Sequence, residues 1–292
     1  MKSNSVIFFL LVSLNGIAQN VGIGNPNPAE KLDVTGNINV TGTIKANGTD
    51  GKPNQVLMKN NTGELEWGDM CEFKNFLTYY SNGTFTVPAG VTKIMVELWG
   101  GGGGGNWYCG GGGGGYVKIQ LAVLPGNAAT VQIGSGGNAA NAATAPDGGD
   151  TNFTLGSNVY AAFGGGGAEY VASSRYNPGL GGTGVPSATP KSYLLVPGAA
   201  GGIQTKRYGQ NSPTTFFEVT NGGDGGATYK FPTSGGNAPQ NISNITASST
   251  VMTNGANPNG QLPGGGGASG LISLGASVAA GKGASGMAIV YY

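Results

Sequence analysis

The residue types that most enzymes use for acid–base and nucleophilic chemistry are scarce in this chain. It has no histidine, so neither a Ser-His-Asp or Cys-His catalytic arrangement nor a histidine-containing metal site can form. The 13 acidic residues are scattered, and Asp147-Gly148-Gly149-Asp150 is interpreted as a solvated turn in preference to a weak calcium site. A pair of carboxylates that meet across the fold would still suit glycoside hydrolysis. With that alternative open, the sequence predicts a protein that is not an enzyme and has no metal or cofactor.

The two cysteines, Cys71 and Cys109, are too few for a four-thiolate metal site. In an exported protein they can pair as one disulfide, and the sequence leaves the paired and the unpaired states equally open.

A glycine pattern that suggests nucleotide binding also fails on inspection. Gly100, Gly102 and Gly105 follow a strand-like segment with the spacing of a dinucleotide-binding loop. That loop must lead into a helix whose amino terminus faces the pyrophosphate. Here the segment Asn106-Trp107-Tyr108-Cys109 and six more glycines follow, with no helical periodicity, so we expect no nucleotide cofactor.

The glycine runs 100–105 and 110–115 instead suit a lattice of three-residue-per-turn extended helices. Such a helix has no internal hydrogen bonds, so buried N–H and C=O groups must find partners on neighbouring segments. Only glycine on all three faces allows neighbours on every side. We therefore expect all-glycine runs to lie inside the lattice; the candidates are 100–105, 110–115, 164–167 and 264–267.

The overall composition limits the partners. Charged residues make up 9% of the chain and the net charge is +1, so no electrostatic footprint for nucleic acid or an anionic membrane is expected. The 59 glycines and 15 prolines bring the chain to the level at which low complexity must be considered. The apolar content of 38% favours a folded chain, although a flexible glycine-rich chain remains an alternative.

The amino terminus has the features of a secretory signal peptide. Lys2 is followed by an apolar stretch at residues 6–14 and by Gly16-Ile17-Ala18, a small-x-small cleavage signal. No stretch reaches the roughly 20 apolar residues of a membrane-spanning helix. We assign residues 1–18 to the signal and expect a secreted or cell-surface protein.

Residues 19–68 have the pattern of a β-stalk. From Val34 to Gly48 apolar residues and glycines alternate with polar residues, and Gly36, Gly42 and Gly48 recur every six positions. A single strand cannot bury such a face alone, so other chains are expected to cover it; ordinary short strands are the alternative. Residues 55–59 and 64–68, on either side of an Asn/Gly turn, predict a hairpin.

Two stretches resemble known families. NVGIGNPNPAEKLDVTGNINVTGTIKANG followed by QVLMKNNTGELEWG resembles the amino-terminal region of exported tail-fibre-like proteins of Gram-negative bacteria, which is similar to trimeric phage stalks and implies a homotrimer. F-x-V-P-x-G-V-x-x-I-x-V-x-x-W followed by six glycines, with GMAIVYY at the carboxyl end, resembles the glycine-rich domain of phage tail-fibre tips. That resemblance implies an all-β or irregular fold in which strands cap a bundle of polyglycine II helices. It assigns residues 69–83 to a connector and 84–292 to the glycine-rich domain.

The resemblance also implies that loops between the glycine helices bind a receptor. Aromatic and basic residues in the segments between glycine clusters are the candidates for contacts to a glycan or surface-protein ligand. The candidates are Trp107, Tyr108, Tyr170, Arg175, Tyr176, Arg207 and Tyr208. The predicted function is an exported, non-enzymatic adhesin; an ice-binding protein or a purely structural matrix or filament protein is the alternative.

Overall fold

The computed structural model describes residues 20–60, 62–69, 73–140, 143–172, 175–186, 192–212, 215–221, 224–231, 234–236, 240–244, 250–253, 259–273 and 276–292. These residues form strands β1–β24 and no helix, which confirms the all-β prediction. The chain divides into two compact units, Met1–Cys71 and Glu72–Tyr292.

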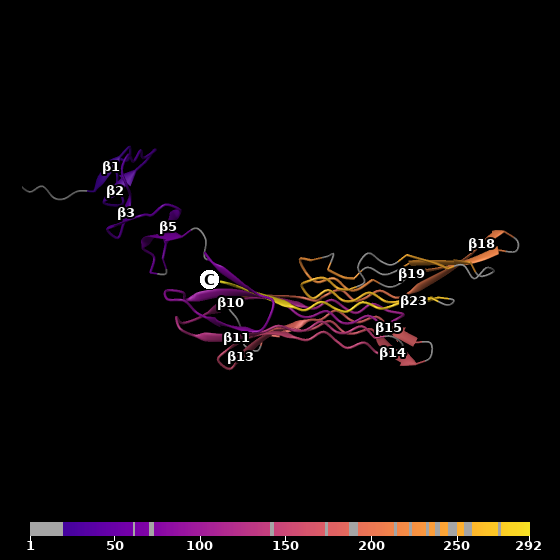
Figure 1. Ribbon diagram of the computed structural model, residues 1–292. Helices are drawn as coiled ribbons and strands as arrows, with labels where there is room; N and C mark the ends of the chain where they lie inside the picture. Colours follow the sequence, from indigo (N-terminus) through magenta and orange to yellow (C-terminus); the bar gives the residue numbers. More distant parts are fainter. Residues whose placement is uncertain are drawn as a thin grey trace, which may run out of the picture. The chain divides into compact units, whose positions relative to one another are not determined.

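The first unit contains three small sheets (Figure 1). β1 pairs with β2 in parallel, and the antiparallel pairs are β3 with β4 and β5 with β6. The bounds are β1 Val21–Ile23, β2 Leu32–Val34, β3 Lys45–Ala46, β4 Thr49–Asp50, β5 Gln55–Lys59 and β6 Leu65–Asp69. The β5–β6 hairpin was predicted, and the Asn60 side chain closes its turn by accepting hydrogen bonds from the N–H groups of Thr62 and Glu64.

The continuous strand expected from Val34 to Gly48 is not present in the single chain. Only its ends, in β2 and β3, are strands, because the backbone between them has no neighbouring segment with which to form a ladder. The apolar side chains of the repeat are correspondingly exposed: Ile38 at 66%, Val40 at 47% and Ile44 at 48%. Gly36 and Gly48 have φ values of 144° and 76°, which explains glycine at two of the three repeat positions.

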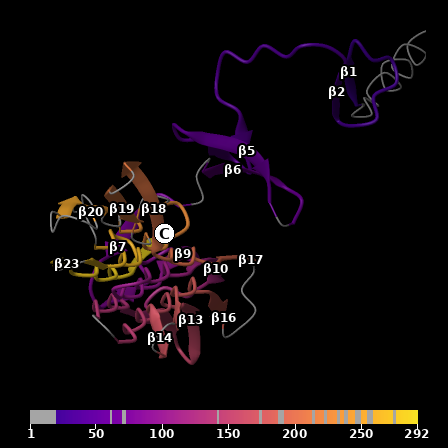
Figure 2. The same cartoon turned by 90° about the vertical axis from the view of Figure 1, so that its right-hand side faces the viewer.

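The second unit begins with a sandwich of two five-stranded sheets. The first sheet has the order β17-β10-β9-β24-β7, and the second has the order β16-β13-β12-β11-β8. Figure 2 shows the two sheets as adjacent layers. The bounds are β7 Phe76–Tyr79, β8 Gly83–Thr86, β9 Lys93–Trp99, β10 Tyr116–Ala122, β11 Ala128–Gln132, β12 Thr151–Leu155, β13 Asn158–Ala162, β16 Gly184–Pro186, β17 Ser192–Val196 and β24 Met287–Tyr291.

The core of the unit lies between these two sheets. Alternate residues of β9 and β10 are apolar and face it, and they meet Phe85, Val131 and Phe153 from the second sheet. The residues of β9 and β10 in the core are Ile94, Val96, Leu98, Val117, Ile119 and Leu121. Burial of these large apolar side chains therefore stabilises the sandwich.

One boundary differs from the sequence prediction. Residues 69–83 were assigned to a connector, yet Phe76–Tyr79 forms β7 and pairs with the carboxyl-terminal strand β24. The strand was missed because its alternation covers only four residues. Its pairing partner lies more than 200 residues away, at the other end of the unit.

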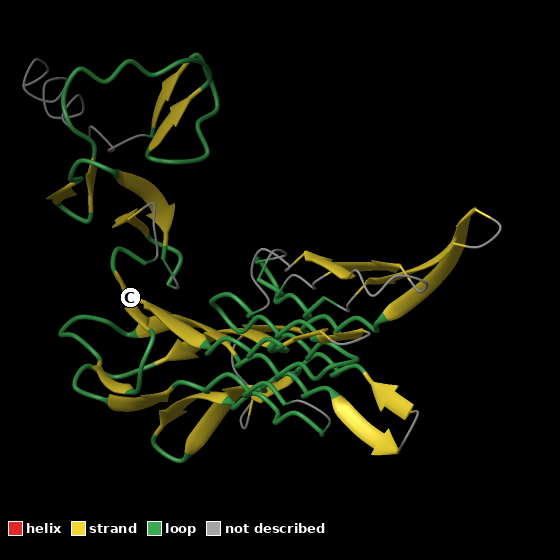
Figure 3. Ribbon diagram, turned by 45° about the vertical axis from the view of Figure 1, so that its right-hand side comes forward, coloured by secondary structure: helices red, strands yellow, loops and turns green. Residues whose placement is uncertain are grey.

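Beyond the sandwich, the glycine runs form a hydrogen-bonded lattice (Figure 3). The N–H donors of residues 100–105 change partner with a period of three residues. Gly100 and Gly103 donate to Gly115 and Gly112, Gly101 and Gly104 donate to Gly149 and Pro146, and Gly102 and Gly105 donate to Ala284 and Gly281. A period of three in backbone partners is the geometry of a three-fold extended helix. The carbonyl groups of the same run accept from segments 137–140, 165–168 and 267, so this run is bonded on all sides.

The second long run is equally enclosed. Its N–H groups donate to segments 199–202, 163–166 and 264–267, and its carbonyls accept from segments 100–103, 179–182 and 226. Residues 100–106 and 109–117 are buried, as are 263–270. Interior positions are thus confirmed for 100–105, 110–115 and 264–267.

The prediction of an interior position was wrong for 164–167. This run lies at a side of the lattice, and the N–H groups of Gly164 and Gly167 bond to the carboxylates of Asp150 and Asp147 in place of another backbone segment. A run of glycines therefore does not by itself guarantee six backbone neighbours, because acidic side chains can cap one face.

Candidate recognition surface

The lattice segments run between the sandwich and a set of turns and hairpins at the far end, which we call the hairpin end (Figure 1). From β9, residues 100–105 reach the turn 106–109, and residues 110–115 return to β10. Further passes lead to the β14–β15 hairpin, the β18–β21 sheet and the β22–β23 hairpin. The bounds are β14 Glu169–Ala172, β15 Arg175–Asn177, β18 Thr205–Ser212, β19 Thr215–Asn221, β20 Gln240–Asn244, β21 Thr250–Thr253, β22 Leu271–Ser273 and β23 Ala276–Val278.

Asn106 fixes the turn at the end of the first glycine run. Its fully buried side-chain oxygen accepts hydrogen bonds of 2.9 Å from the N–H groups of Tyr108 and Cys109. Its own N–H donates to the carbonyl of Cys109 at 2.9 Å. Asparagine is suited to this position because its short amide satisfies backbone N–H groups in tight turns.

The same residue connects the turn to the bases of two hairpins. The Asn106 amide donates to the carbonyl of Ala168, the residue before β14, at 3.2 Å. Its carbonyl accepts from Gly270, the residue before β22, at 2.8 Å. We infer that Asn106 sets the relative positions of these hairpins, although sequence reasoning did not single it out.

The predicted ligand-binding residues all lie in elements of the hairpin end. Trp107 and Tyr108 are half-buried in the turn, and Tyr170 is exposed in β14, where its N–H donates to Thr144 Oγ1 at 2.9 Å. The backbones of Arg175 and Tyr176 lie in β15, and those of Arg207 and Tyr208 lie in β18. The side chains of these last four are outside the described set. The sequence thus selected residues that the fold gathers at one end.

Cys109 is fully buried, and burial raises the pKa of its thiol to about 11. Cys71 lies outside the described residues, so the disulfide between Cys71 and Cys109 stays a prediction. A neutral, buried thiol packs as a small apolar group and has little nucleophilic character.

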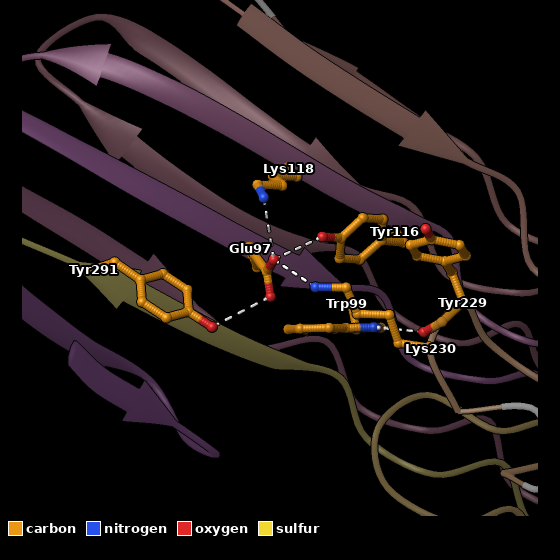
Figure 4. Close-up of polar contacts among 7 residues, drawn as sticks. All are labelled: Glu97, Trp99, Tyr116, Lys118, Tyr229, Lys230 and Tyr291. Atoms are coloured by element: carbon orange, nitrogen blue, oxygen red, sulfur yellow. Dashed lines mark hydrogen bonds and ion pairs between the residues drawn. The ribbon is translucent and has the colours of Figure 1, made fainter. Parts of the chain in front are cut away.

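A charged cluster at the sandwich end was not found from sequence (Figure 4). Glu97 is 3% exposed, and its Oε1 lies 2.6 Å from Lys230 Nζ and 4.0 Å from Lys118 Nζ. Tyr116 donates its hydroxyl hydrogen to Oε1 at 2.9 Å. Burial, followed by the bond to Glu97, raises the pKa of Tyr116, so this hydroxyl stays protonated and remains a donor. Lys230 is 133 residues from Glu97, and no local pattern indicates the pairing.

The turn that carries Lys230 is clamped over the outer face of β9 and β10. Trp99 Nε1 donates to the carbonyl of Tyr229 at 3.0 Å, while the Phe231 ring packs edge-on against Trp99. Lys230 Nζ lies 5.3 Å from the ring centre of Tyr116. The backbone of Lys230 has a positive φ of 68°. The cluster therefore holds the turn between the lattice segments 224–227 and 234–236 against the sandwich.

Within the described part of the chain, no three His, Cys, Asp or Glu side chains gather in a way that could hold a metal ion. The described residues also contain no helix long and apolar enough to cross a membrane.

The comparison with known families identifies the glycine-rich part of the chain as a known domain. Residues 78–292 match the glycine-rich domain family, so the chain belongs to that family. The matched region starts within β7 and ends at the last residue, and it therefore covers the sandwich, the lattice and the hairpins. No match was found among curated proteins.

Proposed function

We propose that this protein is an exported, non-enzymatic adhesin whose glycine lattice presents the hairpin end to a glycan or protein on a cell surface. The observation that carries the proposal is the common location of the candidate residues. Lattice passes that start from different strands turn round at the same end, and Trp107, Tyr108 and the elements with Tyr170, Arg175, Tyr176, Arg207 and Tyr208 lie there. A rigid scaffold with variable loops at one end is a common design for recognition.

The lattice itself suits a spacer better than a catalyst. Its described interior runs, 100–105, 110–115 and 264–267, are all glycine and bond through their backbone groups, so these runs offer no side chains for chemistry. Dense backbone bonding offsets the entropy that glycine loses on folding. The scaffold can thus keep loops at a fixed distance from the sandwich.

We further propose that the first unit associates into a homotrimer. In this unit Ala46 is the only buried apolar residue among those described, whereas Ile23, Leu32 and Ile38 are 57–66% exposed. A unit without a core needs a partner to cover its apolar surface. Light scattering of the mature chain should give a trimer, and a monomer would contradict this part of the proposal.

The alternative functions make different demands on the lattice surface. Ice binding needs a regular array of threonine or alanine on a flat side. The described side formed by segments 144–150 and 164–170 instead shows Thr144, Asp147 and Asp150 bonded to backbone N–H groups. A structural matrix protein would bind nothing. Purified mature protein should therefore be tested on a glycan array and on intact bacterial and animal cells; binding to neither would contradict the adhesin proposal.

A further inference from the structure

The outer face of the first five-stranded sheet carries an open hollow. Alternate residues of β9, β10 and β17 form this face, because the residues between them in β9 and β10 face the core. The register places Leu194 opposite Lys118. In the next row, Ser192 and Met95 lie on either side of Gln120. These five residues are among those that line the hollow, whose volume is about 390 Å³. Small-molecule sites have volumes of roughly 300–1,000 Å³, so the hollow suits a small ligand.

The charges beside this hollow do not balance. Glu97 Oε1 lies 2.6 Å from Lys230 Nζ and accepts the Tyr116 hydroxyl hydrogen at 2.9 Å. A carboxylate oxygen has two lone pairs, so both acceptor positions of Oε1 are occupied. Lys118 Nζ lies 4.0 Å from the same oxygen, which is beyond hydrogen-bond distance (Figure 4). The described part of this cluster therefore has two ammonium groups for one carboxylate, a net charge of +1.

A ligand in the hollow can reach the positive member of this pair and not the negative one. The Lys118 side chain is 40% exposed, whereas Glu97 is buried. Leu194, opposite Lys118, is 43% exposed and offers apolar surface beside the ammonium group. The half-buried Met95 adds to this apolar surface. The hollow thus combines an accessible positive charge with an apolar wall.

We propose that this hollow binds a small carboxylate with an apolar body, such as a short-chain fatty acid or an aromatic acid. The carboxylate accepts a hydrogen bond from Lys118 Nζ, and the apolar body covers Met95 and Leu194. A net charge of +1 matches a monoanion, and a mainly apolar wall with a few polar groups is the usual lining of a small-molecule site. This inference goes beyond the adhesin function, because the hollow lies on the sandwich and the candidate recognition residues lie at the hairpin end.

The ligand class is tested on the mature protein by calorimetry with hexanoate and benzoate. Hexanamide and benzamide are the neutral controls of nearly the same shape. Each acid should bind about tenfold or more tightly than its amide, because only the acid forms a charge-assisted hydrogen bond. The affinity should also decrease with rising ionic strength, since a partly exposed charge is screened. Equal affinities for acids and amides, or no binding of either acid, would overturn the inference.

The role of the lysine is tested by Lys118→Met, which should weaken hexanoate binding about tenfold or more. Lys282→Met is the matched control and should leave the affinity unchanged. It removes the same charge from a lattice segment whose neighbouring residue, Gly281, accepts a hydrogen bond from Gly105 at the far end of the first glycine run. Hexanoate binding by Lys118→Met with wild-type affinity would overturn the site.

A second variant tests the site with Lys118 in place. Leu194→Glu introduces a carboxylate opposite Lys118 on the edge strand β17, where it competes with the ligand for the same ammonium group. This variant should lose hexanoate binding. Leu194→Gln, of similar size and without charge, should still prefer hexanoate to hexanamide. Undiminished hexanoate binding by Leu194→Glu would place the ligand elsewhere and contradict the proposal.

Discussion

The carboxylate of Asp147 accepts a hydrogen bond of 2.7 Å from the backbone N–H of Gly167. Three residues further on, Asp150 accepts one of 2.9 Å from Gly164, and three residues earlier Thr144 Oγ1 accepts from Tyr170 at 2.9 Å. The spacing of three on both segments matches the three-residue turn of the lattice helices. Side-chain acceptors here replace the backbone neighbour that an edge helix lacks.

Removal of such an acceptor should weaken the lattice edge. Asp147→Leu leaves the Gly167 N–H without its partner and should lower the free energy of unfolding by about 1 kcal/mol, a modest value because water can reach this edge. Asp147→Asn keeps the accepting oxygen and should change stability by less than about 0.5 kcal/mol. Denaturant unfolding of both variants checks this; equal losses would show that charge, and not the hydrogen bond, matters.

Interior glycines should tolerate no side chain. A Cβ atom at Gly103 would overlap the carbonyl oxygen of Gly166, and backbone cannot move aside as a flexible side chain can. Gly103→Ala should therefore destabilise the second unit by at least about 3 kcal/mol.

Gly42→Ala is the matched control for this substitution, because a Cβ at Gly42 meets nothing within 4 Å in the single chain. Its effect on thermal unfolding of the second unit should be negligible. A stable Gly103→Ala protein would show that the run does not lie inside the lattice.

Lys230 and Lys118, the two lysines near Glu97, should contribute unequally to the free energy of unfolding. Lys230→Met leaves the buried carboxylate without its 2.6 Å partner and should reduce stability by about 2 kcal/mol, less than for a fully buried pair because the Lys230 side chain is 42% exposed. Lys118→Met, at 4.0 Å and 40% exposed, should cost under about 1 kcal/mol.

A double-mutant cycle of Glu97→Gln and Lys230→Met tests whether the pair itself is responsible. We expect a coupling energy of about 1 kcal/mol or more, since the residues are in direct contact. Additive effects would mean that the turn is held by its aromatic contacts alone.

The Cys109 thiol should be protected by its pKa of about 11, against an ordinary value of 9.0. At pH 8 its thiolate fraction is about 100-fold lower than in the unfolded chain, so alkylation should be slower by at least that factor until the protein unfolds. The folded state retains the proton between pH 9 and about 11 while the unfolded state loses it, so this contribution to stability is present below pH 9 and decreases through that window. Cys109→Ala should remove that part of the pH dependence. Alkylation as fast in native as in denatured protein would contradict the burial.

Much of the sandwich could be predicted from the sequence, whereas the contacts of Asn106 and the Glu97–Lys230 pair could not. The alternating residues of β9, β10 and β24 carry a local signal of period two, and the solid glycine runs have few other uses in a folded chain. Asn106 had a weak signal, an asparagine directly after a glycine run, but the hairpins that it connects lie 62 and 164 residues away. Glu97 and Lys230 meet only because of the lattice topology. A continuous strand over 34–48 is absent from the single chain, since alternation shows which residues can face a partner and not whether one chain supplies it.

The central claim, recognition by the hairpin end, is tested most directly by binding to intact cells with variants at opposite ends of the second unit. Trp107→Ala, Tyr176→Ala and Tyr208→Ala should each reduce cell binding by about tenfold or more with unchanged unfolding temperature. Tyr193→Ala removes a 58% exposed tyrosine of β17 at the sandwich end and should leave binding unchanged. Loss of binding in Tyr193→Ala together with full binding in the three hairpin-end variants would contradict the account.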